Sequence, residues 1–84
     1  MNNNRNTELL IKFGLVLKEL RVQRNLTQEA LAFEANIEIS QVYRIEKGKL
    51  NVTLSTLNLL SNALNISLSE LMLQLERELS RVSN

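Results

Sequence analysis

Apolar residues recur along this chain at the three- and four-residue steps that place side chains on one face of a helix. One series predicts a helix over residues 7–24, and a second predicts a helix that follows Thr53 and ends near Leu64. The first series consists of Leu10, Phe13, Leu17 and Leu20. The second consists of Leu54, Leu57, Leu60, Ala63 and Leu64. Residues 1–6 are mostly polar, and we expect them to form a flexible N-terminal arm.

Capping residues mark three more helices. Thr27 is a favourable N-cap and predicts a helix that runs to about Glu34. Another helix is expected over residues 39–47, ending at Gly48, which is free to adopt positive φ. Residues 67–70 (Ser-Leu-Ser-Glu) have the pattern of a capping box and predict a last helix over residues 68–82. The sequence therefore predicts an all-α fold of five helices.

Residues 28–47 have the pattern of a helix-turn-helix. Ala32 is small where the two short helices would cross closely, and Asn36 occupies the turn, where a left-handed residue is commonly needed. The apolar residues expected to face inward between the two helices are Leu31, Ala35, Ile37, Val42 and Ile45. The motif indicates a DNA-binding protein whose second helix enters the major groove.

Composition narrows the function classes further. The chain has 84 residues, for which we expect one domain over residues 7–84. It contains no histidine, no cysteine and no aspartate, so we expect neither an enzyme nor a metal site, and no cofactor or small-molecule ligand. The absence of cysteine and of any run long enough to span a membrane favours a cytoplasmic protein. The net charge is only +1, but Arg44, Lys47 and Lys49 cluster at the end of the motif.

Several separated segments resemble the Cro/repressor-type (XRE) helix-turn-helix family. They are residues 26–32 (LTQEALA), 45–49 (IEKGK), 54–57 (LSTL) and 63–67 (ALNIS), and the resemblance covers residues 13–71. It implies a five-helix lambda-repressor-like domain, here with extended first and last helices. Three positions depart from the family pattern. Asn36 replaces the usual turn glycine, Glu38 replaces the Ser or Thr that caps the recognition helix, and Val52 stands where proline is common.

The same resemblance implies roles for particular residues. Base contacts are expected from Ile39, Ser40, Tyr43 and Arg44. Contacts to the DNA backbone are expected from Gln28, Gln41, Lys47, Lys49 and Asn51. Arg21 and Glu46 match a structural pair that ties the first helix to the end of the recognition helix. Alternatives stay open, since Ile39 and Tyr43 can instead be partly buried beside the turn, and the basic cluster can be only a solvated face.

The last helix carries a heptad-spaced apolar seam. Its members are Leu68, Met72, Leu75, Leu79 and Val82. The seam can mediate a homodimer or pack on the long first helix of its own chain, and we favour the dimer. The function predicted is a sequence-specific transcriptional regulator of the Cro-like repressor or restriction–modification controller type. It would bind a palindromic operator in double-stranded DNA as a homodimer. The alternative is a protein-interaction module or antitoxin with the same fold.

Overall fold

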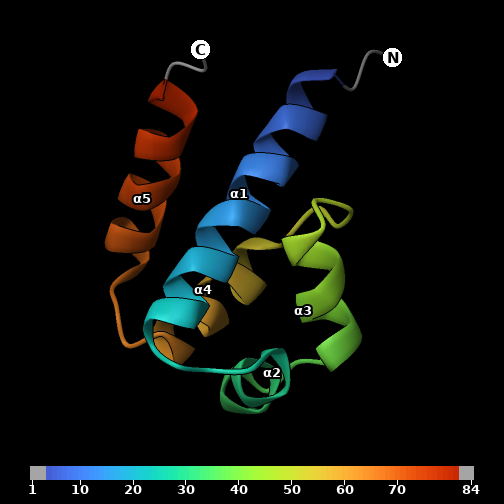
Figure 1. Cartoon of the computed structure of the whole chain (residues 1–84), viewed down its shortest axis with the longest axis vertical. Coiled ribbons are helices and arrows are strands. Elements are labelled where there is room, and N and C mark those ends of the chain that lie inside the picture. The colour runs from blue at the N-terminus through green and yellow to red at the C-terminus, as the bar shows by residue number, and fades with distance from the viewer. Residues whose placement is uncertain (1–3, 82–84) are drawn as a thin grey trace.

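The computed structural model describes residues 4–81, which form five helices and no strand. The helices are α1 (Asn4–Gln23), α2 (Gln28–Ala35), α3 (Ile39–Glu46), α4 (Leu54–Ala63) and α5 (Leu68–Ser80). The predicted all-α class and the number of helices are confirmed (Figure 1). No helix in this part of the chain is both long and apolar enough to cross a membrane.

The ends of the first and last helices differ from the prediction. Helix α1 begins at Asn4, three residues before the predicted start at residue 7. Polar residues are tolerated in the first turn of a helix, and α1 therefore extends beyond its apolar series. Helix α5 ends at Ser80, and Val82 lies outside the described residues.

Side-chain caps fix where three of the helices begin. The hydroxyl oxygens of Thr27, Thr53 and Ser67 each accept the backbone N–H three residues later, at 3.0, 3.1 and 3.0 Å respectively. These bonds satisfy donors that the first turn leaves without a helical partner. Helix α3 begins with a capping box, in which the Glu38 side chain pairs with the backbone N–H of Gln41 and Gln41 Oε1 accepts the backbone N–H of Glu38 at 3.3 Å.

A left-handed residue follows each of the first four helices. Asn36 has a φ of 58° and Gly48 a φ of 73°, as predicted for both. Asn25 and Asn65 adopt the same conformation after α1 and α4, with φ of 58° and 60°. Asparagine tolerates this region better than other residues with a Cβ atom, so three of the turns rely on the same residue type.

The core draws on all five helices. The side chains with at most 1% exposure include Leu17, Leu31, Ala35, Val42, Ile45, Leu60, Leu64 and Leu71. Among the residues that the structure describes, Ser61 is polar and buried, and its hydroxyl donates to the carbonyl oxygen of Asn58 at 2.8 Å. Leu54, the first residue of α4, is 72% exposed, so the predicted apolar series of this helix starts one step too early.

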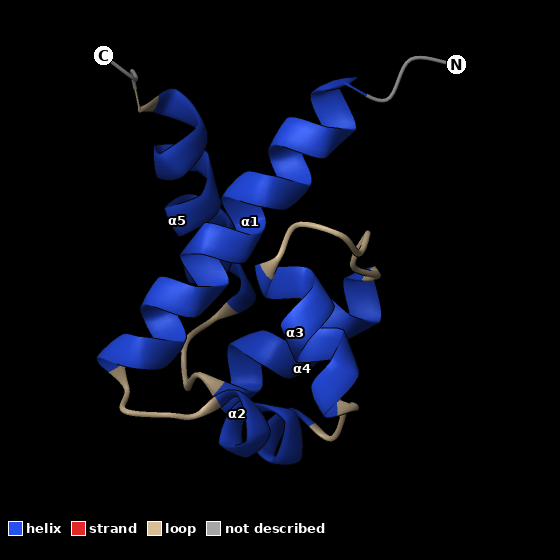
Figure 2. Cartoon of the chain, turned by 45° about the vertical axis from the view of Figure 1, so that its right-hand side comes forward, coloured by secondary structure: helices blue, strands red, loops and turns tan. Residues whose placement is uncertain are grey.

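Helix α1 is the central element of the packing. It contacts α3 on one side and α5 on the other, while α2 packs against α3 and α4 (Figure 2). Gly14 allows the contact with α3, because a Cβ atom there would lie 2.5 Å from the carbonyl oxygen of Ile45 and 2.8 Å from that of Glu46. In both views the start of α1 and the end of α5 lie at the same end of the molecule, away from α2.

Candidate nucleic-acid interface

Helix α3 separates a buried side from an open one. Val42 and Ile45 are 0% and 1% exposed and anchor the helix to the core. The four residues expected to contact bases all lie on the exposed side: Ile39, Ser40, Tyr43 and Arg44. Ile39 and Tyr43 are 48% and 52% exposed, so both side chains keep about half of their surface available. The open side therefore combines an apolar group, two hydroxyls and a guanidinium.

Arg21 and Glu46 join α1 to the end of α3. Arg21 Nε donates to Glu46 Oε2 at 2.6 Å, and Arg21 Nη2 donates to Glu46 Oε1 at 3.1 Å. The two side chains are only 11% and 5% exposed. The hydrogen bond to Glu46 raises the pKa of Arg21 above its ordinary value, with the Coulombic attraction adding to it and desolvation opposing it. The guanidinium is therefore charged at every ordinary pH.

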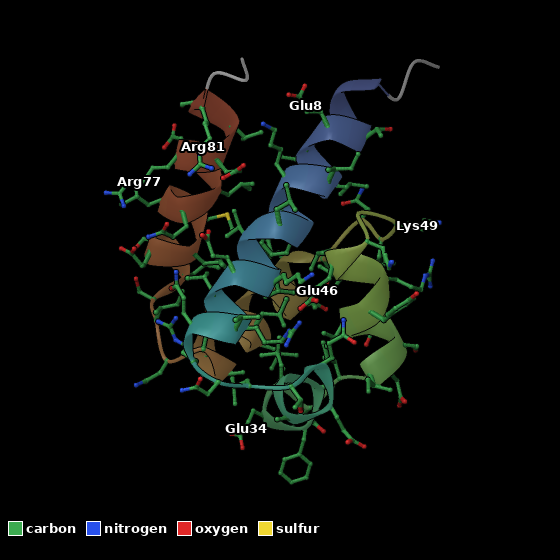
Figure 3. All side chains as sticks on the ribbon, viewed as in Figure 1. Glu8, Glu34, Glu46, Lys49, Arg77 and Arg81 are labelled. Atoms are coloured by element: carbon green, nitrogen blue, oxygen red, sulfur yellow. The ribbon has the colours of Figure 1, made fainter. Side chains whose placement is uncertain are left out.

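Gln28 belongs to the same network, which sequence reasoning did not anticipate. Its Nε2 atom donates to Glu46 Oε1 at 3.0 Å, and Arg21 Nη1 donates to the carbonyl oxygen of Leu26 at 2.7 Å. The network thus links α1, α2 and α3, and Figure 3 shows Glu46 between α1 and α3. Gln28 keeps a second amide N–H and its oxygen for another partner, beside the positive N-terminus of α2.

The remaining residues expected to contact the DNA backbone surround the end of α3. Lys47 lies with its Nζ atom 5.4 Å from the centre of the Tyr43 ring. Lys49 and Asn51 are exposed in the loop before α4, and Figure 3 shows Lys49 at the outer edge of the molecule. Gln41 is half-buried, and its oxygen is the acceptor that caps α3. Its amide N–H groups are the donors left for a phosphate.

A groove between α1 and α3 adds a cation that the sequence analysis missed. It has a volume of about 540 Å³ and is lined by Leu15, Lys18, Arg21, Gln28, Tyr43, Glu46 and Lys47. Lys18 lies three residues before Arg21, and residues at this spacing share a helix face. That spacing is the signal by which Lys18 could have been placed beside Arg21 from the sequence. The groove brings Lys18 and Lys47 to the same side of the molecule as Gln28.

The apolar seam of α5 is divided between the core and the surface. Met72 and Leu75 pack against the core of their own chain, and Leu68 is half-buried. Leu79 is 41% exposed, and so is Leu73 at 39%. Met72 and Leu75 also line an apolar groove of about 180 Å³, together with Leu9, Leu10, Phe13, Asn51, Val52 and Leu57. Intrachain packing therefore occupies part of the seam and leaves its C-terminal part open.

A family comparison identifies the motif. The model of the helix-turn-helix family matches residues 17–71, which include α2, α3 and α4. This chain belongs to the XRE-type helix-turn-helix family.

Within residues 4–81, no group of three acidic, histidine or cysteine side chains is arranged to hold a metal ion.

Two sequence relatives of this helix-turn-helix protein are control proteins. It is 39% identical to the control protein C.MunI of Mycoplasma sp over 72 residues, which is 84% of this chain and 97% of that protein. It is 32% identical over 73 residues to the control protein C.BamHI of Bacillus amyloliquefaciens, covering 86% and 85% of the two chains.

Solved structures give the same result. The restriction–modification controller protein C.AhdI from Aeromonas hydrophila shares 44% identity, with a TM-score of 0.72 over 74% of this chain and 94% of that one. The controller protein C.Esp1396I, crystallised as a tetramer in complex with its natural 35-base-pair operator, shares 30% identity. Its TM-score is 0.81 over 87% of this chain and 96% of that one. The predicted family and the lambda-repressor-like fold are confirmed.

Proposed function

We propose that this protein is a transcriptional regulator of the restriction–modification controller type that binds operator DNA through α3. The observation that carries the proposal is the open side of α3, which the Arg21–Glu46–Gln28 network holds against the rest of the fold. The relatives are controller and repressor proteins, which supports a binding function and not catalysis. A regulator of this kind acts where the DNA is, in agreement with the predicted cytoplasmic location.

The dimensions of α3 suit the major groove. An α-helix with its side chains is about 10–12 Å in diameter, and the major groove of B-DNA, about 12 Å wide, admits such a helix. Arg44 is suited to donate two hydrogen bonds to guanine, and Ser40 to bond a base edge or a phosphate. Ile39 and Tyr43 supply apolar surface for a thymine methyl group. These four side chains are proposed to read the operator sequence.

A second set of side chains is proposed to position the protein on the phosphates. It consists of Gln28, Gln41, Lys47, Lys49 and Asn51, to which the groove between α1 and α3 adds Lys18. Such contacts fix the orientation of the protein and carry no sequence information directly. Because most of them are charged or lie at a helix N-terminus, they make the affinity depend on salt.

We further propose that the protein binds as a homodimer through α5 and the first half of α1. Leu9, Ile11, Leu73 and Leu79 are each between 38% and 46% exposed. Leu9 also lines the apolar groove that Met72 and Leu75 share with α1. A symmetric second copy would cover this surface, because a two-fold interface pairs the same patch on both chains. Its two copies of α3 would lie about 34 Å apart and match a palindromic site.

The DNA-binding proposal is tested by selecting bound duplexes from a randomised pool and titrating the selected duplex at several salt concentrations. A dimer that neutralises on the order of eight phosphates should lose about a thousandfold or more in affinity between about 50 and 200 mM salt. A selected palindrome with half-sites one turn apart is expected. No enrichment, or a flat response to salt, would refute DNA binding and favour the protein-interaction alternative.

The dimer proposal is tested with Leu79→Glu and the matched control Leu59→Glu. The two leucines are 41% and 38% exposed, so each substitution places a carboxylate on an open apolar site. Leu59 lies on α4, outside the proposed interface. Sedimentation should show that Leu79→Glu lowers the dimer fraction at micromolar concentration and that Leu59→Glu does not. Equal dimer fractions for both variants and the parent protein would contradict the interface.

A further inference from the structure

Glu38 stands at the start of the recognition helix, where the chain departs from its own pattern. Helices α2, α4 and α5 begin with Thr27, Thr53 and Ser67, whose hydroxyl oxygens cap the first turn. At the start of α3, a glutamate takes this place in a capping box. The Glu38 side chain pairs with the backbone N–H of Gln41, and Gln41 Oε1 accepts the backbone N–H of Glu38 at 3.3 Å. Glu38 therefore caps α3, but serine and threonine are preferred at this position, so the cap does not require the longer, charged side chain of glutamate.

The position of Glu38 places its carboxylate beside the proposed base-contact residues. It is exposed and directly precedes Ile39 and Ser40, which are exposed as well. In helix-turn-helix proteins, the N-terminal residues of the recognition helix contact base edges. A carboxylate has two oxygens and several acceptor positions, so a local bond to the helix leaves acceptor capacity for another donor.

The negative charge of Glu38 determines which bases attract its carboxylate and which repel it. Glu46, the last residue of α3, is 5% exposed and paired with Arg21, whereas Glu38, which precedes the helix, is exposed. Phosphates repel an open carboxylate, and the repulsion is offset only where a donor meets it. In the major groove, cytosine presents the N4 amino group without an acceptor on the same base. Adenine presents its N6 amino group beside the N7 acceptor, which repels a carboxylate.

We propose that Glu38 is a specificity-determining residue that accepts a hydrogen bond from the N4 amino group of a cytosine in each half-site. Its charge also weakens binding to DNA that lacks this cytosine. The inference rests on the proposed function, because it requires α3 to lie in the major groove. It concerns one side chain of that interface, and DNA binding by the other residues does not depend on it.

The test compares Glu38→Ser, Glu38→Gln and the control Glu34→Gln. Serine is a preferred N-cap, so Glu38→Ser keeps the start of α3 while its side chain is too short to reach the base. Glutamine keeps the length, loses the charge and is suited to pair with adenine. Glu34 is an exposed carboxylate in the last turn of α2, on the side of that helix opposite α3 in Figure 3, so Glu34→Gln makes the same charge change away from the open side of α3.

Each variant is titrated against the duplex selected by the parent protein and against duplexes with every C·G pair replaced in turn. The parent protein should lose roughly 5- to 150-fold in affinity when one particular C·G pair is replaced. Glu38→Ser should lose that discrimination and bind random DNA more tightly. Glu38→Gln should prefer A·T at the same pair, and Glu34→Gln should match the parent protein.

The outcomes separate the inference from the proposed function. If Glu38→Ser and Glu38→Gln keep the parent discrimination at every C·G pair, Glu38 does not read cytosine, although the protein binds DNA. If the parent protein selects no duplex at all, the proposed function fails and the inference falls with it. Thermal melting of each variant verifies that a lost discrimination is not due to an unfolded chain.

Discussion

Removing Glu46 tests how strongly the fold depends on the network under the recognition helix. Three hydrogen bonds end on its carboxylate, two from Arg21 and one from Gln28. In Glu46→Ala, the guanidinium of Arg21 would remain largely buried, with only the carbonyl oxygen of Leu26 as its partner. Breaking a buried pair in this way costs about 3–5 kcal/mol. The Arg21 side chain is 11% exposed, so water compensates a little and we expect about 3 kcal/mol.

That loss is large for a chain of this size. Domains of about this length lose roughly 4–8 °C in Tm for each kcal/mol, so Glu46→Ala should melt on the order of 15 °C lower. Arg21→Ala should have a similar effect, since it leaves the Glu46 carboxylate, 5% exposed, with Gln28 alone. The double variant should lose about 4 kcal/mol and not the sum of about 6, because the second truncation removes a charge that the first left unpaired.

The assay is urea unfolding followed by circular dichroism, with all four proteins at one concentration, because a dimer becomes more stable as concentration rises. The same unfolding experiment is repeated in about 1 M salt. Because salt screens exposed ion pairs most, the interaction energy of this largely buried pair should change less than that of a surface pair. Free energies that add within about 0.5 kcal/mol would show that the two side chains do not stabilise each other. The structural account of the network would then be wrong.

Four further predictions each concern a single position. Gly14→Ala should lower the free energy of unfolding by about 1–3 kcal/mol, measured by urea titration, because the added Cβ atom would meet the backbone of α3. In an open helix the same substitution is stabilising, so a higher free energy of unfolding for Gly14→Ala would contradict the close contact of α1 with α3. Asn36→Ala should lower the free energy of unfolding by about 1 kcal/mol, because residue 36 has a left-handed φ that alanine disfavours, whereas glycine at the same position should not lower it. Equal melting temperatures for Asn36→Ala and Asn36→Gly would refute this explanation. Arg44→Ala should cost about 1–3 kcal/mol on the selected duplex and flatten preference at one base pair. Lys49→Ala should weaken selected and scrambled duplexes alike and lower the salt slope by about one, and identical profiles for the two variants would remove the distinction.

Local signals in the sequence accounted for most of the fold. The caps Thr27, Thr53 and Ser67 act within a few residues, so the starts of their helices could be predicted closely. The open side of α3 also followed from periodicity, because Val42 and Ile45 define the buried side. Polar residues carry no such periodicity, and the start of α1 at Asn4 was therefore missed.

Features that depend on distances between helices could not be predicted in this way. The hydrogen bond from Gln28 to Glu46 requires the start of α2 to lie next to the end of α3. The need for glycine at position 14 arises from two carbonyl groups on α3, more than 30 residues later in the chain. The division of the α5 seam depends on which leucines reach α1, and heptad spacing alone does not contain that information.

The contact at Gly14 has a consequence for the spacing of the operator. Helix α1 touches α3 at Gly14 and, through Lys12, reaches the carbonyl oxygen of Glu78 on α5 at 3.5 Å. One continuous helix therefore connects the proposed dimer interface to the recognition helix and fixes their relative orientation. One base pair inserted between the half-sites shifts them by about 3.4 Å and turns them by about 35°. A continuous helix does not bend to follow that rotation, so on such an operator only one of the two copies of α3 should bind its half-site.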